Sequence, residues 1–231
     1  MHSDLLLLAD GRFPAGGHSW SAGVETAVGV GDVVDTPTLE RYLAGRLATT
    51  GTVDAAFSVA ACAAALATDD DRTLDLTDAF ALLDREYDAR VPSPHLRATS
   101  RRLGRHFLRA AHPIWPSPAL DAVSTPIDGS HQSIVLGAAV AAVDGTTADA
   151  AAIALHHLAT AVTTAGVRLL GLDPIELVAV ASRALAAAVP DTPTVSSWAC
   201  ASAAELPALG GSLTEILGEH HRQLDGRLFV A

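Results

Sequence analysis

Alanine-rich apolar runs constrain the fold of this chain more than any other feature of its sequence. One run covers residues 52–67 and reads TVDAAFSVAACAAALA, and related runs occupy residues 131–143 and 148–170. Alanine is the strongest helix former, and its small side chain lets helices approach closely. Because only 4% of the residues are aromatic, the core must consist mainly of Ala, Leu and Val. The runs therefore predict buried, closely packed helices.

Helix-start signals recur between these runs, whereas strand signals are almost absent. Thr36-Pro37 and Ser93-Pro94 each place a capping side chain directly before a proline, an order that favours the first turn of a helix. No stretch alternates β-branched and polar residues, and no Asn-Gly hairpin turn occurs. The sequence therefore predicts an all-α protein of roughly ten packed helices with an Ala/Leu-rich core.

The segment 112–130 is the main candidate for a long connection between helices. It includes the stretch HPIWPSPALDAVSTPIDG, which holds four prolines. A loop of this size more often joins elements of one core than two separate domains. We therefore expect a single domain over residues 1–231, with a Pro-rich internal loop at 112–130.

The formal net charge of −11 limits the classes of partner. A dedicated nucleic-acid binder needs a basic face, so we expect no nucleic-acid partner, whereas basic protein surfaces suit an acidic chain. The N-terminus lacks the basic start of a signal sequence, and the longest uncharged apolar tract, from Ala55 to Thr68, is too short to span a bilayer. We therefore expect a cytoplasmic protein with no membrane partner.

The cysteines and histidines give no clear metal or cofactor site. Cys62 and Cys200 lie in apolar stretches without a CxxC pair, so we expect two buried free thiols. The ten histidines include adjacent pairs at 156–157 and 220–221, whose side chains diverge on a helix. We therefore expect no metal site within one chain and no cofactor, and the alternative is a site assembled from two copies at a dimer axis.

The glycine-rich stretch GRFPAGGHSWSAG, residues 11–23, follows an apolar run as a phosphate-binding loop would. Gly11 and Gly16 have the spacing of that motif. However, Gly17 stands where the motif has lysine, and His18 stands where it has serine or threonine. These two side chains contact the phosphates and the magnesium ion, so their absence argues against nucleotide binding.

The same stretch also resembles a serine nucleophile elbow, G-x-S-x-G, around Ser19. The final glycine is replaced by Ser21, and no sheet is predicted to carry such an elbow. The favoured interpretation is a set of tight turns in which Ser19 or Ser21 caps the helix that follows.

Four segments carry motifs that occur in the same order in one protein family. The first has Pro14, Gly16, Gly17, Ser19, Ser21, Gly23 and Glu25, the second Arg97, Ser100, Gly104 and Leu108, the third Val167, Arg168, Leu169 and Leu172, and the fourth His221, Arg227, Leu228 and Phe229. Together they resemble the urease accessory protein family UreF. Phe13, His18 and Val24 depart from the family pattern, which is typical of a divergent member.

The resemblance implies an all-α, homodimeric scaffold that has no catalytic activity of its own. Its expected partners are the accessory protein UreD, also called UreH, the GTPase UreG and apo-urease, to which the assembly delivers nickel under the control of GTP hydrolysis. The alternatives are a generic helical adaptor or, less favoured, a small all-α enzyme. The expected partner interface consists of Pro14, Gly16, Gly17, Ser19, Ser21, Gly23, Glu25, Arg97, Arg101, Arg168, Leu169, Arg227, Leu228 and Phe229.

Arginines recur every four residues along one predicted helix, at Arg97, Arg101, Arg105 and Arg109. They follow one helix face that drifts by about 40° per step, because a turn takes 3.6 residues. Two interpretations stay open. The face docks a partner, since arginine is enriched at interface anchors, or it pairs with nearby acids such as Asp84, Glu86 and Asp88.

Arg168 and the C-terminal tail, residues 226–231, each allow two interpretations. A cation suits the C-terminal end of the helix that carries Arg168, or this arginine pairs with Glu25 and fixes the N-terminal loop. The tail combines arginine with apolar residues, so we expect it to order on binding a partner. Packing on the chain's own core is the alternative.

Overall fold

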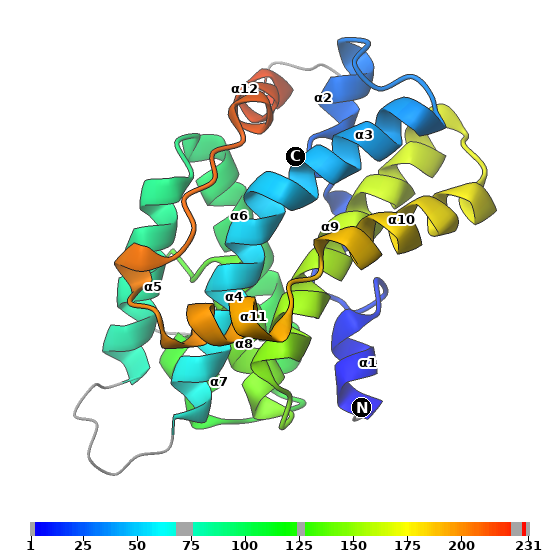
Figure 1. The fold of residues 1–231 in the computed structure, drawn as a ribbon. Helices are drawn as coiled ribbons and strands as arrows, with labels where there is room; N and C mark the ends of the chain where they lie inside the picture. The colour runs from blue at the N-terminus through cyan, green and yellow to red at the C-terminus, as the bar shows by residue number, and fades with distance from the viewer. Residues whose placement is uncertain (1–2, 68–75, 124–127, 223–227, 230–231) are drawn as a thin grey trace.

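A computed structural model describes residues 3–67, 76–123, 128–222 and 228–229 of the chain (Figure 1). All the regular elements in these residues are helical, and none of these residues lies in a strand. The predicted all-α class is therefore confirmed. The α-helices are α1 (Ser3–Ala9), α2 (Val24–Gly29), α3 (Thr36–Arg46), α4 (Thr52–Leu66), α5 (Leu76–Arg90), α6 (Pro94–Ala111), α7 (Pro118–Val123), α8 (Gln132–Ala142), α9 (Thr147–Leu170), α10 (Pro174–Ala188), α11 (Thr192–Cys200) and α12 (Ser212–His221).

The centre of the molecule is formed by α4 and α8, with α9 packed beside both. Every residue from Ser133 to Val140 in α8 is buried, and α4 buries the run from Ala55 to Cys62. Helices that are apolar on all sides belong inside a protein. The alanine-rich runs at 52–67, 131–143 and 148–170 thus supply the three central helices.

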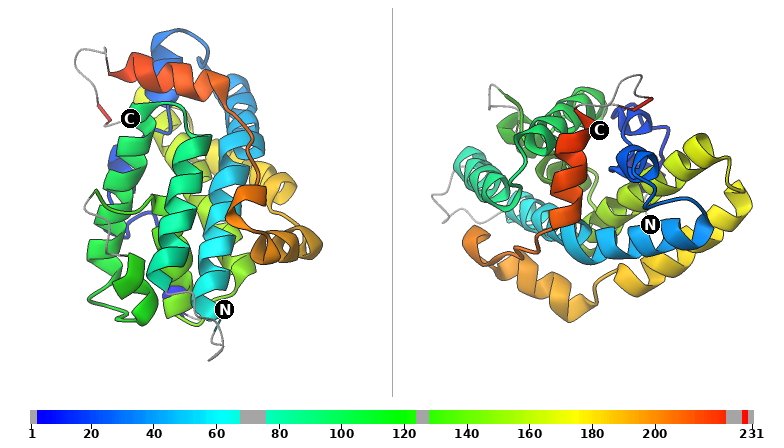
Figure 2. Two further views of the ribbon diagram at one scale, coloured as in Figure 1. Left: turned by 90° about the vertical axis from the view of Figure 1, so that its left-hand side faces the viewer. Right: turned by 90° about the horizontal axis from the view of Figure 1, so that it is seen from above.

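The other long helices surround this centre. α6 packs on α8, while α3 and α10 pack against each other and against α9. The last helix, α12, crosses one end of the upright helices and contacts α2 and α6 (Figure 2). A short π-helical turn, η2 (Leu47–Gly51), joins α3 and α4. This arrangement brings α2, from the N-terminal part of the chain, and the last helix, α12, together at one end.

The helix boundaries agree with most of the predicted signals and correct two of them. Ser93 caps α6 as predicted. The N-cap of α3 is Asp35 instead of Thr36, and its carboxylate accepts the N–H of Thr38 in a capping box. The Pro-rich segment 112–130 is not all loop, because it contains the short helix α7; residues 124–127 lie outside the described part.

The two cysteines differ in burial, which corrects the expectation that both are buried. Cys62 is buried in α4, and Cys200 is exposed at the end of α11. Burial raises the pKa of the Cys62 thiol to about 12, with a smaller contribution from Asp149. Cys62 is therefore an inert core residue.

Two helical stretches, Thr36–Leu66 and Thr147–Leu170, have the length and apolar composition that a membrane span requires. More than half of the apolar window of each is buried inside the protein. Burial of this kind is what the core helices of a soluble protein show.

Candidate partner-binding site

The N-terminal loop, residues 10–23, is fixed to the helices at both of its ends. At its start, Arg12 forms an exposed ion pair with Asp10. The ring of Phe13 then packs against Phe107 of α6 and against Trp115, with ring centroids 5.1 and 5.9 Å apart. These aromatic contacts place the exposed Pro14 at the surface, next to the glycine turn.

Two glycines allow the loop to turn where other residues would be strained. Gly16 and Gly23 have φ angles of 80° and 83°, in the left-handed region. A Cβ atom at Gly23 would lie 2.6 Å from the Tyr42 hydroxyl, and one at Gly16 would lie 2.7 Å from Nδ1 of His106. The predicted role of these glycines in tight turns is therefore confirmed, and the closeness of α3 and α6 adds a second reason for it.

The carbonyl of Ala22 fastens the end of the loop to α3. It accepts hydrogen bonds from the Tyr42 hydroxyl at 2.8 Å and from Nη1 of Arg46 at 2.9 Å. Ala22 itself has a φ of 54°, which is uncommon for a residue with a Cβ atom. The two donors on one carbonyl therefore stabilise a backbone conformation that the sequence alone does not favour.

The two serines of the loop have different roles. Ser19 donates its hydroxyl proton to the carbonyl of Gly16 at 2.8 Å, which closes the turn. Ser21 is buried, and its oxygen accepts the N–H of Glu25 at 3.4 Å. Ser21 therefore supports the first turn of α2, which leaves Gly23 as an N-cap without a side-chain hydrogen bond.

The carboxylate of Glu25 joins α2 to the end of the chain. It accepts the N–H of Leu228 at 2.6 Å and the N–H of Phe229 at 3.2 Å. Its Oε2 atom also lies 2.9 Å from Nε2 of the buried His221 in α12. We call Glu25, His221, Leu228 and Phe229 the Glu25 junction.

Arg168 reaches the Glu25 junction through an aromatic ring instead of the proposed pairing with Glu25. Its guanidinium lies over the ring of Phe229, 4.3 Å from the centroid, as in a cation–π contact. Leu169 is half-buried beside it. Glu25 and Arg168 are therefore linked by Phe229, which lies between them.

Phe229 is buried in the chain's own core. This matches the second interpretation of the tail, packing on the core, and not the expectation that the tail orders only on binding a partner. The side chain of Phe229 is 4% exposed, whereas Leu228 is 52% exposed. Arg227 lies outside the described residues. Of the two tail residues described, Leu228 is thus the one available to a partner, and Phe229 anchors it.

The arginine stripe on α6 divides into two parts. Arg101 is mostly buried, and its guanidinium binds the carboxylates of Asp84 and Asp88 together with the carbonyl of Gly129. Arg97 lies 3.8 Å from Asp88. These two positions follow the acid-pairing interpretation, and a partner contact at Arg101 stays a prediction.

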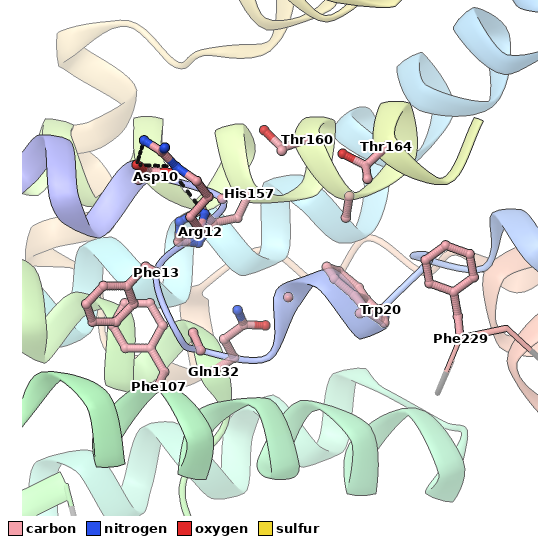
Figure 3. Close-up of a pocket in the computed structure, with 14 residues that line it drawn as sticks. Asp10, Arg12, Phe13, Trp20, Phe107, Gln132, His157, Thr160, Thr164 and Phe229 are labelled. Carbon is pink, nitrogen blue, oxygen red and sulfur yellow. Dashed lines mark hydrogen bonds and ion pairs between the residues drawn. The ribbon is translucent and has the colours of Figure 1, made fainter. Parts of the chain in front are cut away.

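A cavity of about 320 Å³ lies between the N-terminal loop and α9 (Figure 3). Aromatic side chains lie at both ends, and α9 supplies polar groups. The aromatic residues are Phe13 and Phe107 at one end and Trp20 and Phe229 at the other, and the α9 residues are His157, Thr160 and Thr164. The cavity therefore joins the loop, α9 and the tail into one site.

His157 is held neutral in this cavity. Burial lowers its pKa to about 4, and its Nε2 atom lies 2.8 Å from the carbonyl of Leu8. Because a carbonyl oxygen can only accept, the neutral imidazole carries its proton on Nε2 and donates it to the carbonyl of Leu8 in α1. Sequence reasoning missed His157, although His157, Thr160 and Thr164 form a polar stripe on an apolar helix that signals an unusual face.

The described residues contain no group of three or more His, Cys, Asp or Glu side chains placed to hold a metal ion. His221 is engaged with Glu25, and His157 with the carbonyl of Leu8.

The sequence model of the UreF family matches residues 33–185. Proteins named urease accessory protein UreF are 36% identical in Mycolicibacterium vanbaalenii and 35% identical in Mycobacterium marinum, each over 98% of this chain and 97% of the relative. The protein of that name from Mycobacterium tuberculosis is 36% identical over 76% of each chain.

This chain therefore belongs to the UreF family, as its motifs predicted. It is a urease accessory protein and not an enzyme. The family model begins after the N-terminal loop and ends before the tail, whereas the relative from Mycolicibacterium vanbaalenii matches 98% of this chain.

Proposed function

We propose that this protein is a scaffold of urease maturation that binds the accessory protein UreD (UreH) and the GTPase UreG. In this role it regulates GTP-dependent delivery of nickel to apo-urease in the cytoplasm. The observation that carries the proposal is membership of the UreF family over nearly the full length of the chain.

The Glu25 junction supports a partner surface at the end of the molecule where α2 and α12 meet. Leu228 is exposed there, while Glu25 and Phe229 are held beneath the surface. Pro14 is exposed beside Phe13, at the other end of the cavity. We propose that Gly16, Ser19, Ser21 and Gly23 act on this surface through the shape of the loop, and that Arg168 acts through Phe229. A Cβ atom at Gly17 would meet no neighbouring atom, so its place in the interface stays a prediction. We propose that UreD or UreG contacts this composite face.

A second face supports the proposed homodimer. Ile175 and Val178 of α10 are 81% and 70% exposed, which is unusual for large apolar side chains. A groove of about 400 Å³ runs between α9 and α10 next to them, and His156, Thr163, Val167 and Leu185 line it. We propose that a second copy of the chain covers this face.

Co-expression with UreD and UreG followed by size-exclusion chromatography tests the proposed function. We expect a complex that co-elutes, and its absence both with and without GTP and nickel would overturn the proposal. Leu228→Ser should weaken the complex by about tenfold, since a few central apolar side chains carry most interface energy. Leu209→Ser removes an equally exposed leucine elsewhere and serves as the matched control.

A further inference from the structure

The solvent side of α6 carries a second arginine group that is distinct from the acid-paired residues Arg97 and Arg101. Each step of four residues turns the helix 40° past a full turn, so the stripe rotates away from α5 as it proceeds. Arg102, Arg105 and Arg109 follow at spacings of three and four residues, which places them on one face. We call these three arginines and His106 the α6 basic face.

Two arginines of the α6 basic face, Arg102 and Arg105, bind neutral groups. Nη2 of Arg102 lies 3.4 Å from the Thr99 hydroxyl, and Arg105 donates to the carbonyl of Asp128. Among the described residues, no carboxylate oxygen lies within 4 Å of the guanidinium of Arg102, Arg105 or Arg109. Arg97 and Arg101, on the same helix, both have carboxylate partners.

His106 shows that the charges on this face are of one sign. Burial lowers the pKa of its imidazole, and Arg109, Arg102 and Arg105 lower it further. Arg105 likewise lowers the pKa of Arg102, after burial. The face is therefore a site of mutual repulsion, which an external anion would relieve.

The α6 basic face adjoins the N-terminal loop. A Cβ atom at Gly16 would lie 2.7 Å from Nδ1 of His106, so the glycine turn and the face form one continuous surface. The chain as a whole has a formal net charge of −11. A positive patch on such a chain attracts acidic partners at long range and pairs with their carboxylates in the complex.

We propose that the α6 basic face docks an acidic segment of a partner protein, with carboxylates placed opposite Arg102, Arg105 and Arg109. The seven residue-to-residue steps from Arg102 to Arg109 span about 10 Å along the helix axis. Glutamates at positions i, i+3 and i+7 of a partner helix have the same spacing. A nucleic acid is disfavoured as the occupant, because phosphate binding draws on more contacts and the rest of the chain is acidic.

The inference deepens the proposed function, on which it rests for the assembly in which the partner occurs. The probe is a 14-residue helical peptide with glutamates at i, i+3 and i+7, compared with the same peptide carrying glutamines. Binding is measured by fluorescence anisotropy at about 0.05 M and about 0.5 M salt, because the screening length falls from above 10 Å to a few ångströms.

We expect the full chain to bind the glutamate peptide about tenfold more tightly than the glutamine peptide at low salt, and equally at high salt. The variant Arg102→Gln/Arg105→Gln/Arg109→Gln should lose this preference. The control Arg41→Gln/Arg85→Gln/Arg183→Gln changes the net charge equally at other exposed positions and should keep it. Circular dichroism of both variants checks that they are folded.

Three results would overturn the inference: no preference in the wild type, the same loss in both variants, or tighter binding of a single-stranded oligonucleotide than of the acidic peptide. The proposed function fails by a different observation, the absence of a complex with UreD and UreG. If that complex forms equally with the wild type and with the α6 variant, the docking role is overturned and the proposed function stands.

Discussion

The α4–α8 core and the Glu25 junction are stabilised in opposite ways. The core consists of small apolar side chains that are buried along whole helices, and its polar contacts include the Ser58 hydroxyl bound to the carbonyl of Ser133. The junction depends on one carboxylate that receives two backbone N–H groups and lies against His221. Packing energy is spread over many small contacts in the core, whereas a single side chain organises the junction.

This difference teaches that the fold and the site respond to different mutations. Loss of one core side chain lowers the stability of the whole domain, because cooperative unfolding involves all the helices. Loss of the Glu25 carboxylate frees the tail but leaves the central helices in contact. Substitutions at Phe57, His157 and Glu25 test whether the core and the Glu25 junction differ in this way.

Phe57→Ala should lower the free energy of unfolding by about 3–5 kcal/mol. Phe57 is fully buried in α4, where its ring meets the edge of Tyr87 and lies under the guanidinium of Arg90. Urea unfolding followed by circular dichroism measures the effect. Val189→Ala, at an exposed position, is the control and should change stability by about 0.5 kcal/mol or less. A small effect of Phe57→Ala would mean that the core does not carry the stability assigned to it.

Acid should destabilise the protein through His157, which lies where the core meets the cavity. Burial lowers its pKa from 6.5 to about 4, so the unfolded chain binds this proton first. The stability contributed by the neutral ring is present above about pH 6.5 and is lost as the pH falls toward 4. Between pH 7 and pH 5 the wild type should lose about 2 kcal/mol more than His157→Gln.

The comparison of the two proteins isolates His157, because burial also lowers the pKa of His95, His106 and His131 and these groups titrate in both. Urea unfolding at the two pH values gives the difference directly. Equal losses in the wild type and in His157→Gln would show that His157 is not the group responsible.

Glu25→Gln should cost about 1–2 kcal/mol and act mainly on the tail. An amide keeps one oxygen acceptor but loses the charge that strengthens the bonds to His221, Leu228 and Phe229. We expect unchanged helical content, faster hydrogen exchange at the N–H groups of Leu228 and Phe229, and weaker binding to UreD and UreG. Glu40→Gln removes an exposed carboxylate that pairs with Arg183 and is the matched control. A cooperative loss of helix would place the Glu25 junction within the core.

Sequence patterns predicted the helical regions well because local signals dominate there. The alanine-rich runs became α4, α8 and α9, and Ser93 caps its helix as expected. The prediction missed α7, which is only six residues long and lies among prolines. It also placed Cys200 inside the protein, because an apolar neighbourhood in sequence does not reveal which side of a short helix faces solvent.

The sequence by itself determined the helical class, the small-residue core and the family, because helix propensity, spacing and motifs are local properties of the chain. The tertiary structure alone decided the contacts made between residues far apart in sequence. Glu25 meets residues about 200 positions later. Arg101 meets Asp84 while Arg105 and Arg109 turn to solvent, since the direction of α6 relative to α5 sets which arginines find carboxylates. Such pairings depend on how the helices pack, and no local pattern encodes that.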